Sequence, residues 1–224
     1  MKYLLIIALL FPISASATVT DYFTSGAEDT YIDKLGGTWA ESHDATSGGA
    51  TAYAADLFFD GEEYAAGAFY VIRSFTPIDT SAIGTDNITA AEFYMMPSTV
   101  NGIDAAALVQ STQGSPTAPV VGDFDALGTT EGTDVRVTSF TVDSYFHWTL
   151  NATGIGWINK TGYTLLAERN DYDIDNIDPP VARNYAVIYS SEDGSTKEPF
   201  LRVTHAAGGG GATPAPDDGF IMFE

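Results

Sequence analysis

The sequence predicts an all-β protein, an antiparallel jelly-roll-like β-sandwich of about ten strands. Residues that favour strands recur in short runs, and the chain contains 13 Phe and 12 Tyr besides many Val, Ile and Thr. Turn-forming Gly, Pro, Asp and Asn separate these runs. Helical periodicity is not sustained over windows of about 11 residues, which excludes long amphipathic helices.

Alternation within the runs predicts one buried and one exposed face for each strand. In Phe200–His205, for example, Leu201 and Val203 fall on one face and Arg202 on the other. One turn of helix is expected over Ala152–Ile158. The expected strands are Asp29–Asp33, Ala54–Phe59, Phe69–Phe75, Ala90–Met96, Ala106–Ser111, Val135–Val142, Tyr145–Thr149, Thr164–Arg169, Asn184–Tyr189 and Phe200–Thr204.

The chain divides into three predicted segments. Residues 1–17 have one Lys near the start, an apolar run from Leu4 to Phe11 and the ending Ala15-Ser16-Ala17, a pattern typical of a cleaved signal peptide. The apolar run is far shorter than the ~20 residues of a membrane-spanning helix. We expect the sandwich over residues 18–205 and a flexible Gly- and Pro-rich tail over 206–224. The protein is therefore predicted to be secreted or held at the cell surface.

Charge restricts the partners of this domain. The chain has 30 Asp and Glu against 9 Lys and Arg, a formal net charge of −21, and no Cys. Such a surface repels phosphate groups, so we expect neither nucleic acid nor anionic lipid as a partner. The lack of Cys excludes disulfides, thiol chemistry and cysteine zinc sites. The acidity suits divalent cations and neutral ligands, or serves only to keep the protein soluble in a salty medium.

One short segment places four carboxylates close together: Asp171, Asp173, Asp175 and Asp178. Carboxylate oxygens are the ligands that Ca²⁺ prefers. The spacing is similar to the start of an EF-hand, but Asn176 stands where that loop requires Gly, so the segment is not an EF-hand. We predict a structural calcium ion at these four residues. The alternative is a solvated acidic loop.

Aromatic side chains are the expected ligand contacts, because sugars stack their C–H faces on aromatic rings and bind nearby polar groups. Trp39 follows a Gly-Gly turn in a polar loop with His43, and Tyr172 lies in the acidic segment. These three are the predicted ligand-binding residues, although the sequence leaves open whether Trp39 is exposed or buried. Trp148 and Trp157 are expected in the core.

Catalytic motifs are missing from the sequence. No G-x-S-x-G, H-E-x-x-H or Gly-rich phosphate loop occurs, and His43, His147 and His205 are scattered. We therefore predict no catalytic residue and no enzymatic activity. The sharpest enzyme alternative is a lyase that uses Tyr and His on a jelly roll.

Several segments in this order resemble a known family: Asp29–Ile32, Ile72–Thr80, Ile88–Met95 and Pro199–Thr204. Together they resemble the DNRLRE-type domains of bacterial and archaeal surface proteins over about residues 21–205, although the namesake hexapeptide is absent. The resemblance implies a jelly roll related to carbohydrate-binding modules, some of which recognise acidic polysaccharides. On so acidic a chain, a polyanion would require a local basic patch or bridging cations.

The leading hypothesis is a non-catalytic extracellular carbohydrate-binding or adhesion module that recognises a polysaccharide or cell-surface glycan. The rival is a structural protein of a cell-surface layer or appendage, which self-associates when Phe220–Phe223 of its tail add a strand to a neighbour's sheet. A polysaccharide-lyase-like enzyme is the third hypothesis.

Overall fold

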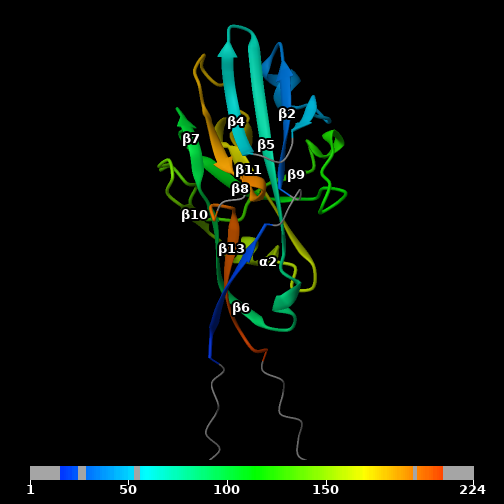
Figure 1. Ribbon diagram of the computed structural model, residues 1–224. Helices are drawn as coiled ribbons and strands as arrows, with labels where there is room; N and C mark the ends of the chain where they lie inside the picture. The colour runs from blue at the N-terminus through cyan, green and yellow to red at the C-terminus, as the bar shows by residue number, and fades with distance from the viewer. Residues whose placement is uncertain (1–15, 25–28, 53–55, 194–195, 209–224) are drawn as a thin grey trace, which may run out of the picture.

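Two antiparallel sheets pack face to face in the computed structural model (Figure 1). The structure describes residues 16–24, 29–52, 56–193 and 196–208. Nearly all of the predicted signal peptide and most of the predicted tail lie outside these residues. The described strands are β1 Thr18–Phe23, β2 Thr30–Gly36, β3 Ala50–Ala52, β4 Asp56–Ala65, β5 Ala68–Asp79, β6 Asn87–Met95, β7 Pro97–Asn101, β8 Ala106–Ser111, β9 Leu127–Glu131, β10 Phe146–Thr149, β11 Tyr163–Asn170, β12 Tyr185–Tyr189 and β13 Phe200–Ala206. The predicted all-β sandwich is confirmed.

Short helices connect the strands. The α-helices are α1 Trp39–His43, α2 Ala152–Gly156 and α3 Asp171–Asp175, and 3₁₀ turns occur at Ser81–Ile83, Val121–Asp123 and Ser191–Asp193. Helix α2 confirms the predicted helical turn. None of the helices in the described part of the chain is long and apolar enough to cross a membrane.

The smaller sheet has four strands in the order β1-β13-β6-β10. Its registers pair Phe23 with Phe200, Phe200 with Tyr94, and Tyr94 with His147. Side chains directly opposite each other in paired strands lie on the same face. These four rings therefore form one row across the sheet, and strands β1 and β10 are its edges.

The larger sheet follows the order β7-β12-β4-β5-β11-β8-β9, and β2 and β3 extend from the other side of β5. Strand β5 organises this sheet. Its first half pairs with β4 through Ile72 and Asp60, and its second half pairs with β11 through Thr76 and Leu166. In Figure 1 the large sheet fills the upper part of the molecule, and strands β6 and β13 of the small sheet lie in the lower part of the molecule.

The main core lies between the sheets. Alternate residues of the small sheet point inward, among them Phe93, Trp148 and Leu201. Burying a side chain of this size stabilises the fold by about 1.5–3 kcal/mol. The Trp148 indole also donates to the Ala106 carbonyl at 3.0 Å, so its one polar group is satisfied. The expected burial of Trp148 is confirmed, and Trp157 packs half-buried against the same core.

A second cluster covers the opposite face of β5. Its members are Ile32, Trp39, Phe69, Val71, Phe75 and Phe124, which come from β2, α1, β5 and the residue that follows the 3₁₀ turn Val121–Asp123. The expectation of one buried and one exposed face fails along β5, because Ile72, Ser74 and Thr76 on its other face are buried as well. Helix α1 and the segment around Phe124 therefore close a face that would otherwise be exposed.

The predicted strand Val135–Val142 is wrong. Of this segment only Val137 pairs with another strand, through a single antiparallel bridge to Ala106. Val135 is 77% exposed, and the neighbouring Arg136 is held by ion pairs rather than by a ladder. The segment is instead an irregular strap beside β10. Strands β1, β3, β7 and β9 were not predicted.

Candidate functional site

Helix α1 carries the predicted ligand residue Trp39 into the protein. The ring is only 7% exposed and stacks on His43 with 5.3 Å between centroids. Its indole N–H donates to Asn176 Oδ1 at 3.0 Å. A ring with a covered face and a satisfied N–H has no surface to offer a sugar, so Trp39 and His43 join α1 to α3.

Helix α3 begins where a calcium loop was predicted. Asn170 accepts the Tyr172 N–H at 2.9 Å and so caps the helix. Asp173 is fully buried, and its two oxygens accept from the guanidinium groups of Arg73 and Arg169 at 2.6–3.0 Å. Burial raises the pKa of Asp173, but the two positive charges outweigh it and hold the pKa well below its usual range.

The other three acidic side chains of this segment lie in different environments and do not converge on one point. Asp175 forms an ion pair with Arg136, Asp178 is exposed, and burial raises the pKa of the half-buried Asp171. In the described ranges no three carboxylate or histidine side chains are placed to hold a metal ion. Because arginine already occupies the oxygens of Asp173 and Asp175, the donor set does not fit calcium. The calcium site stays a prediction that this geometry does not favour.

The structure thus brings several predicted residues together, but they contact one another inside the protein and do not form an open binding surface. His43 Nε2 lies 2.9 Å from the Asp173 carbonyl, and Tyr172 packs against the second hydrophobic cluster. An open hollow of ≈ 380 Å³ lies over this unit, with Arg73 and Arg169 in its lining. Both guanidinium groups are committed to Asp173, so this hollow has little capacity to bind a further anion.

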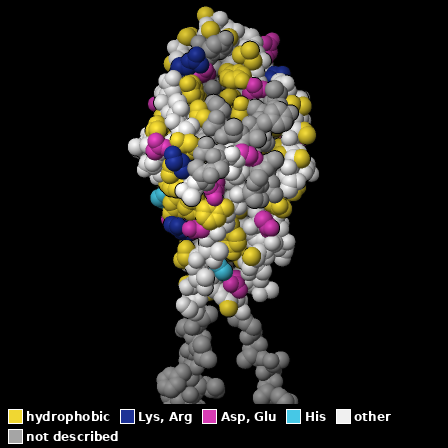
Figure 2. Space-filling view, in the orientation of Figure 1, with side chains coloured by type: hydrophobic (Ala, Val, Ile, Leu, Met, Phe, Trp, Pro, Cys, Tyr) yellow, Lys and Arg dark blue, Asp and Glu magenta, His cyan; other side chains and the backbone are white. Residues whose placement is uncertain are grey.

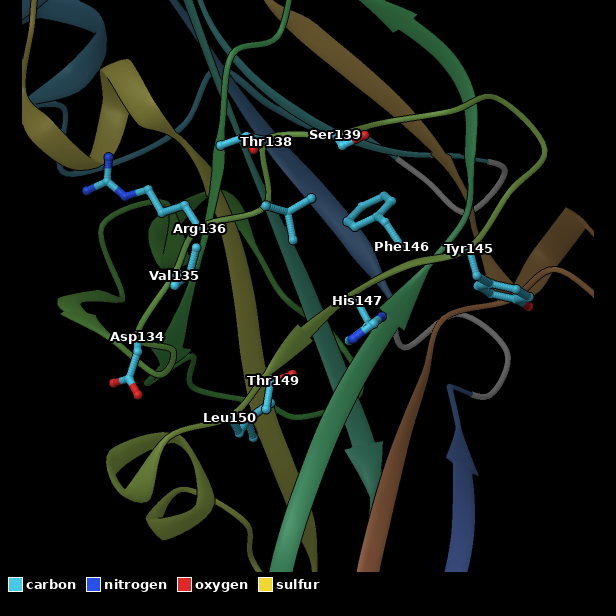
Figure 3. A pocket seen from close by; sticks show the side chains of 11 residues that line it. Asp134, Val135, Arg136, Thr138, Ser139, Tyr145, Phe146, His147, Thr149 and Leu150 are labelled. Carbon is cyan, nitrogen blue, oxygen red and sulfur yellow. The ribbon is translucent and has the colours of Figure 1, made fainter.

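A larger pocket of ≈ 560 Å³ opens beside β10 (Figure 3). Strand β10 forms one wall, and the irregular strap, residues 134–139, forms the other. Its polar lining consists of Asp134, Arg136, Thr138, Ser139, Tyr145, His147 and Thr149. Valine, leucine and phenylalanine side chains form the apolar part of the lining. The volume and the mixture of apolar surface with a few polar groups are typical of small-molecule sites.

The pocket lies at one end of the aromatic row of the small sheet. Ring centroids are separated by 5.3 Å between Phe23 and Phe200, 4.6 Å between Phe200 and Tyr94, and 4.9 Å between Tyr94 and His147. The two central rings are parallel to within 4°, so each covers a face of the other. The two end rings, Phe23 and His147, are the exposed ones, and His147 lines the pocket. Figure 2 shows hydrophobic side chains exposed among charged ones in the lower half of the molecule, where Figure 1 places this sheet.

Hydrogen bonds fix the ring on which His147 rests. The Tyr94 hydroxyl donates to Glu92 Oε2 at 2.6 Å, and Glu92 Oε1 lies 3.9 Å from His147 Nε2. Burial and the bond to Glu92 raise the pKa of Tyr94. The Arg202 guanidinium covers Tyr94 at 5.0 Å and is itself paired with Asp21. The ring position is therefore set before any ligand arrives.

Arg136 fixes the opposite wall. Its side chain points away from the pocket in Figure 3 and donates to Glu131 and Asp175. The hydrogen bonds to Asp175 and Glu131 raise the pKa of Arg136 above its usual value. The hydrogen bonds from Arg136 lower the pKa of Asp175. The strap is thus tied both to the end of β9 and to helix α3.

None of the pocket residues was among the predicted ligand contacts. The alternation in Tyr145–Thr149 does place His147 and Thr149 on the face opposite Trp148, and that signal could have identified them. The strap could not be identified in this way, because Val135–Val142 has the composition of a strand.

Comparison with known proteins adds no assignment. No known protein family matches the chain, and no curated protein sequence is significantly similar to it.

Proposed function

We propose that the protein is a non-catalytic extracellular carbohydrate-binding or adhesion module, and that its ligand site is the pocket beside β10. The supporting observation is the exposed ring of His147, which stacks on Tyr94 at the end of the aromatic row and lines a concave site. A sugar ring presents flat C–H faces and a rim of hydroxyl groups. The pocket supplies an aromatic face for the first and polar side chains for the second.

The hydroxyl groups lie on both sides of this face. Thr149 projects from β10 beside His147, while Thr138 and Ser139 come from the strap across the opening (Figure 3). All three residues are exposed. A ligand between the two walls would exchange hydrogen bonds with water for hydrogen bonds to these hydroxyl groups.

Affinity-gel electrophoresis against a panel of polysaccharides tests this function. We expect retardation of the wild type, loss of retardation in His147→Ala, and no loss in Leu35→Ala, which removes an exposed apolar side chain from the large sheet. Both sites are exposed, so neither substitution should unfold the protein. No retardation of the wild type by any polysaccharide would refute the proposal.

A second candidate function is self-assembly at the cell surface, which an exposed sheet edge supports. Among the described strands β1 pairs only with β13, and it exposes Val19 and Phe23 by 60% and 48%. Such an edge is a template for strand addition. The tail residues Phe220–Phe223, which lie outside the described residues, would supply the strand. Deleting residues 207–224 should abolish assembly under this hypothesis and leave sugar binding intact under the first.

A further inference from the structure

The pocket beside β10 holds a negative charge at its rim. Asp134 is exposed, and its Oδ1 accepts from the Asn151 side-chain amide at 3.1 Å, a bond to a neutral group that leaves the charge unbalanced. Glu92, on the neighbouring strand β6 and outside the pocket lining, adds a second carboxylate 3.9 Å from His147 Nε2. An anionic ligand beside His147 would be repelled by both carboxylates.

The one Arg or Lys in the pocket lining does not offset these charges. Arg136 places Nη1 and Nη2 on the two oxygens of Asp175 at 2.7 and 2.6 Å. Its Nε and Nη2 also donate to Glu131. Two carboxylates therefore neutralise one guanidinium, and its side chain points away from the opening (Figure 3).

The next positive charge is also committed. Arg202 lies over Tyr94, and it donates to both oxygens of Asp21 at 2.7 and 2.8 Å. Around the pocket, the five carboxylates of Asp134, Glu92, Glu131, Asp175 and Asp21 thus outnumber the two guanidinium groups of Arg136 and Arg202. This excess of negative charge determines which sugars the site can bind.

We propose that this pocket selects neutral and amino sugars and rejects sugar carboxylates, an inference that rests on the proposed function. A protonated amine near Asp134 gains a charge-assisted hydrogen bond, which is stronger than a bond between neutral groups. A uronic acid would bring a carboxylate beside Asp134 and Glu92 with no arginine available to pair with it. The selectivity is opposite to that of the modules for acidic polysaccharides implied by the sequence resemblance.

The test compares three polymers in affinity gels at one ionic strength: a neutral glucan, chitosan as a polymer of glucosamine, and polygalacturonate. We expect retardation by the first, stronger retardation by the second and none by the third. Asp134→Asn should weaken binding to chitosan by about two- to fivefold, the effect of one exposed ion pair, and this loss should exceed the loss it causes for the neutral glucan.

Asp125→Asn is the matched control, because it makes the same change of charge at a residue that is 62% exposed and lies outside the pocket lining. Equal weakening by Asp134→Asn and Asp125→Asn would overturn the inference, since total charge would then explain the attraction to chitosan. Binding to polygalacturonate that His147→Ala removes would also overturn it while supporting the proposed function. Absence of binding to every polymer would refute the proposed function itself.

Discussion

Arg136 donates two hydrogen bonds to the Asp175 carboxylate, from Nη1 to Oδ2 at 2.7 Å and from Nη2 to Oδ1 at 2.6 Å. This bidentate pair joins a wall of the β10 pocket to helix α3, which are separate in the sequence. The acidic segment that suggested a calcium loop therefore has a different role in the fold. Asp175 positions the strap, and Asp173 anchors the helix that carries Asp175.

Replacing Arg136 should loosen the strap without unfolding the domain. Arg136→Ala removes pairs that are partly exposed, and such pairs contribute about 0–1 kcal/mol. We expect a small change in Tm, faster hydrogen exchange over residues 134–139 and weaker ligand binding. Lys197→Ala is the control, since it breaks the ion pair with Asp143 outside the pocket. Unchanged exchange in the strap would show that Arg136 does not hold it.

Calcium should have no effect on stability. The oxygens of Asp173 and Asp175 already accept from arginines, and an ion would have to displace them. We therefore expect the same Tm in EDTA and in millimolar CaCl₂, because a ligand that does not bind the native state does not shift its stability. A rise in Tm with calcium that Asp171→Asn removes would contradict this and support the ion predicted from the sequence.

Asp173→Ala should be the most damaging of these substitutions. It leaves the guanidinium groups of Arg73 and Arg169 buried, with only the exposed Asp125 carboxylate, 3.8 Å from Arg73, to balance them. Breaking a buried pair in this way costs about 3–5 kcal/mol. Urea denaturation measures the loss, and Asp125→Asn, which changes an exposed carboxylate near Arg73, should cost far less. A loss no larger than that of the control would mean that water reaches the two arginines.

Much of the fold could be predicted because period-two alternation is a local property. Strand β8 was predicted with its observed bounds, and β5, β6, β11, β12 and β13 differ from prediction by a few residues at their ends. Strands β1, β3, β7 and β9 were missed. In β1 the run Thr18–Phe23 begins at the predicted cleavage site and places exposed Val19 on an edge, so it lacks a clear buried face.

The candidate site could not be predicted in the same way, because it depends on long-range pairing. Val135–Val142 has the composition of a strand, and the ion pairs of Arg136 with Glu131 and with the distant Asp175 hold it outside a strand ladder. Likewise, Asp173 has the spacing of a calcium ligand, and the arginine that removes it from that role, Arg73, is 100 positions away in the sequence. Tertiary ion pairs override local spacing in both places.

Glu192 should make the protein less stable as the pH rises. Burial and the neighbouring Asp29 carboxylate raise its pKa from an ordinary 4.5 to about 7. Between these values the folded state holds a proton that the unfolded state has released, so the free energy of unfolding falls with pH. Glu192→Gln should remove this part of the dependence. Urea denaturation of both proteins at about pH 5 and about pH 8 measures the free energy of unfolding at each pH. The same change in this free energy between the two pH values in both proteins would refute the prediction.

Gly132 leaves room for the Trp157 ring at the base of the strap. A Cβ at this position would overlap the ring, with Cη2 at 2.8 Å, whereas a Cβ at Gly128 would meet the Gln110 carbonyl at 3.6 Å and the Thr130 amide nitrogen at 3.9 Å, both ordinary contacts. Gly132→Ala should therefore destabilise the domain by about 1–3 kcal/mol through overpacking. Gly128→Ala, in strand β9, should be nearly neutral.

A second substitution separates overpacking from a change in backbone freedom. In the Gly132→Ala, Trp157→Leu double variant the smaller side chain makes room for the new methyl group. If overpacking is the cause, Gly132→Ala should cost less when Leu occupies position 157 than in the wild type, and thermal unfolding of the four proteins in the cycle measures the difference. An equal cost in both backgrounds would assign the effect to the backbone and would mean that contact with the Trp157 ring is not the cause.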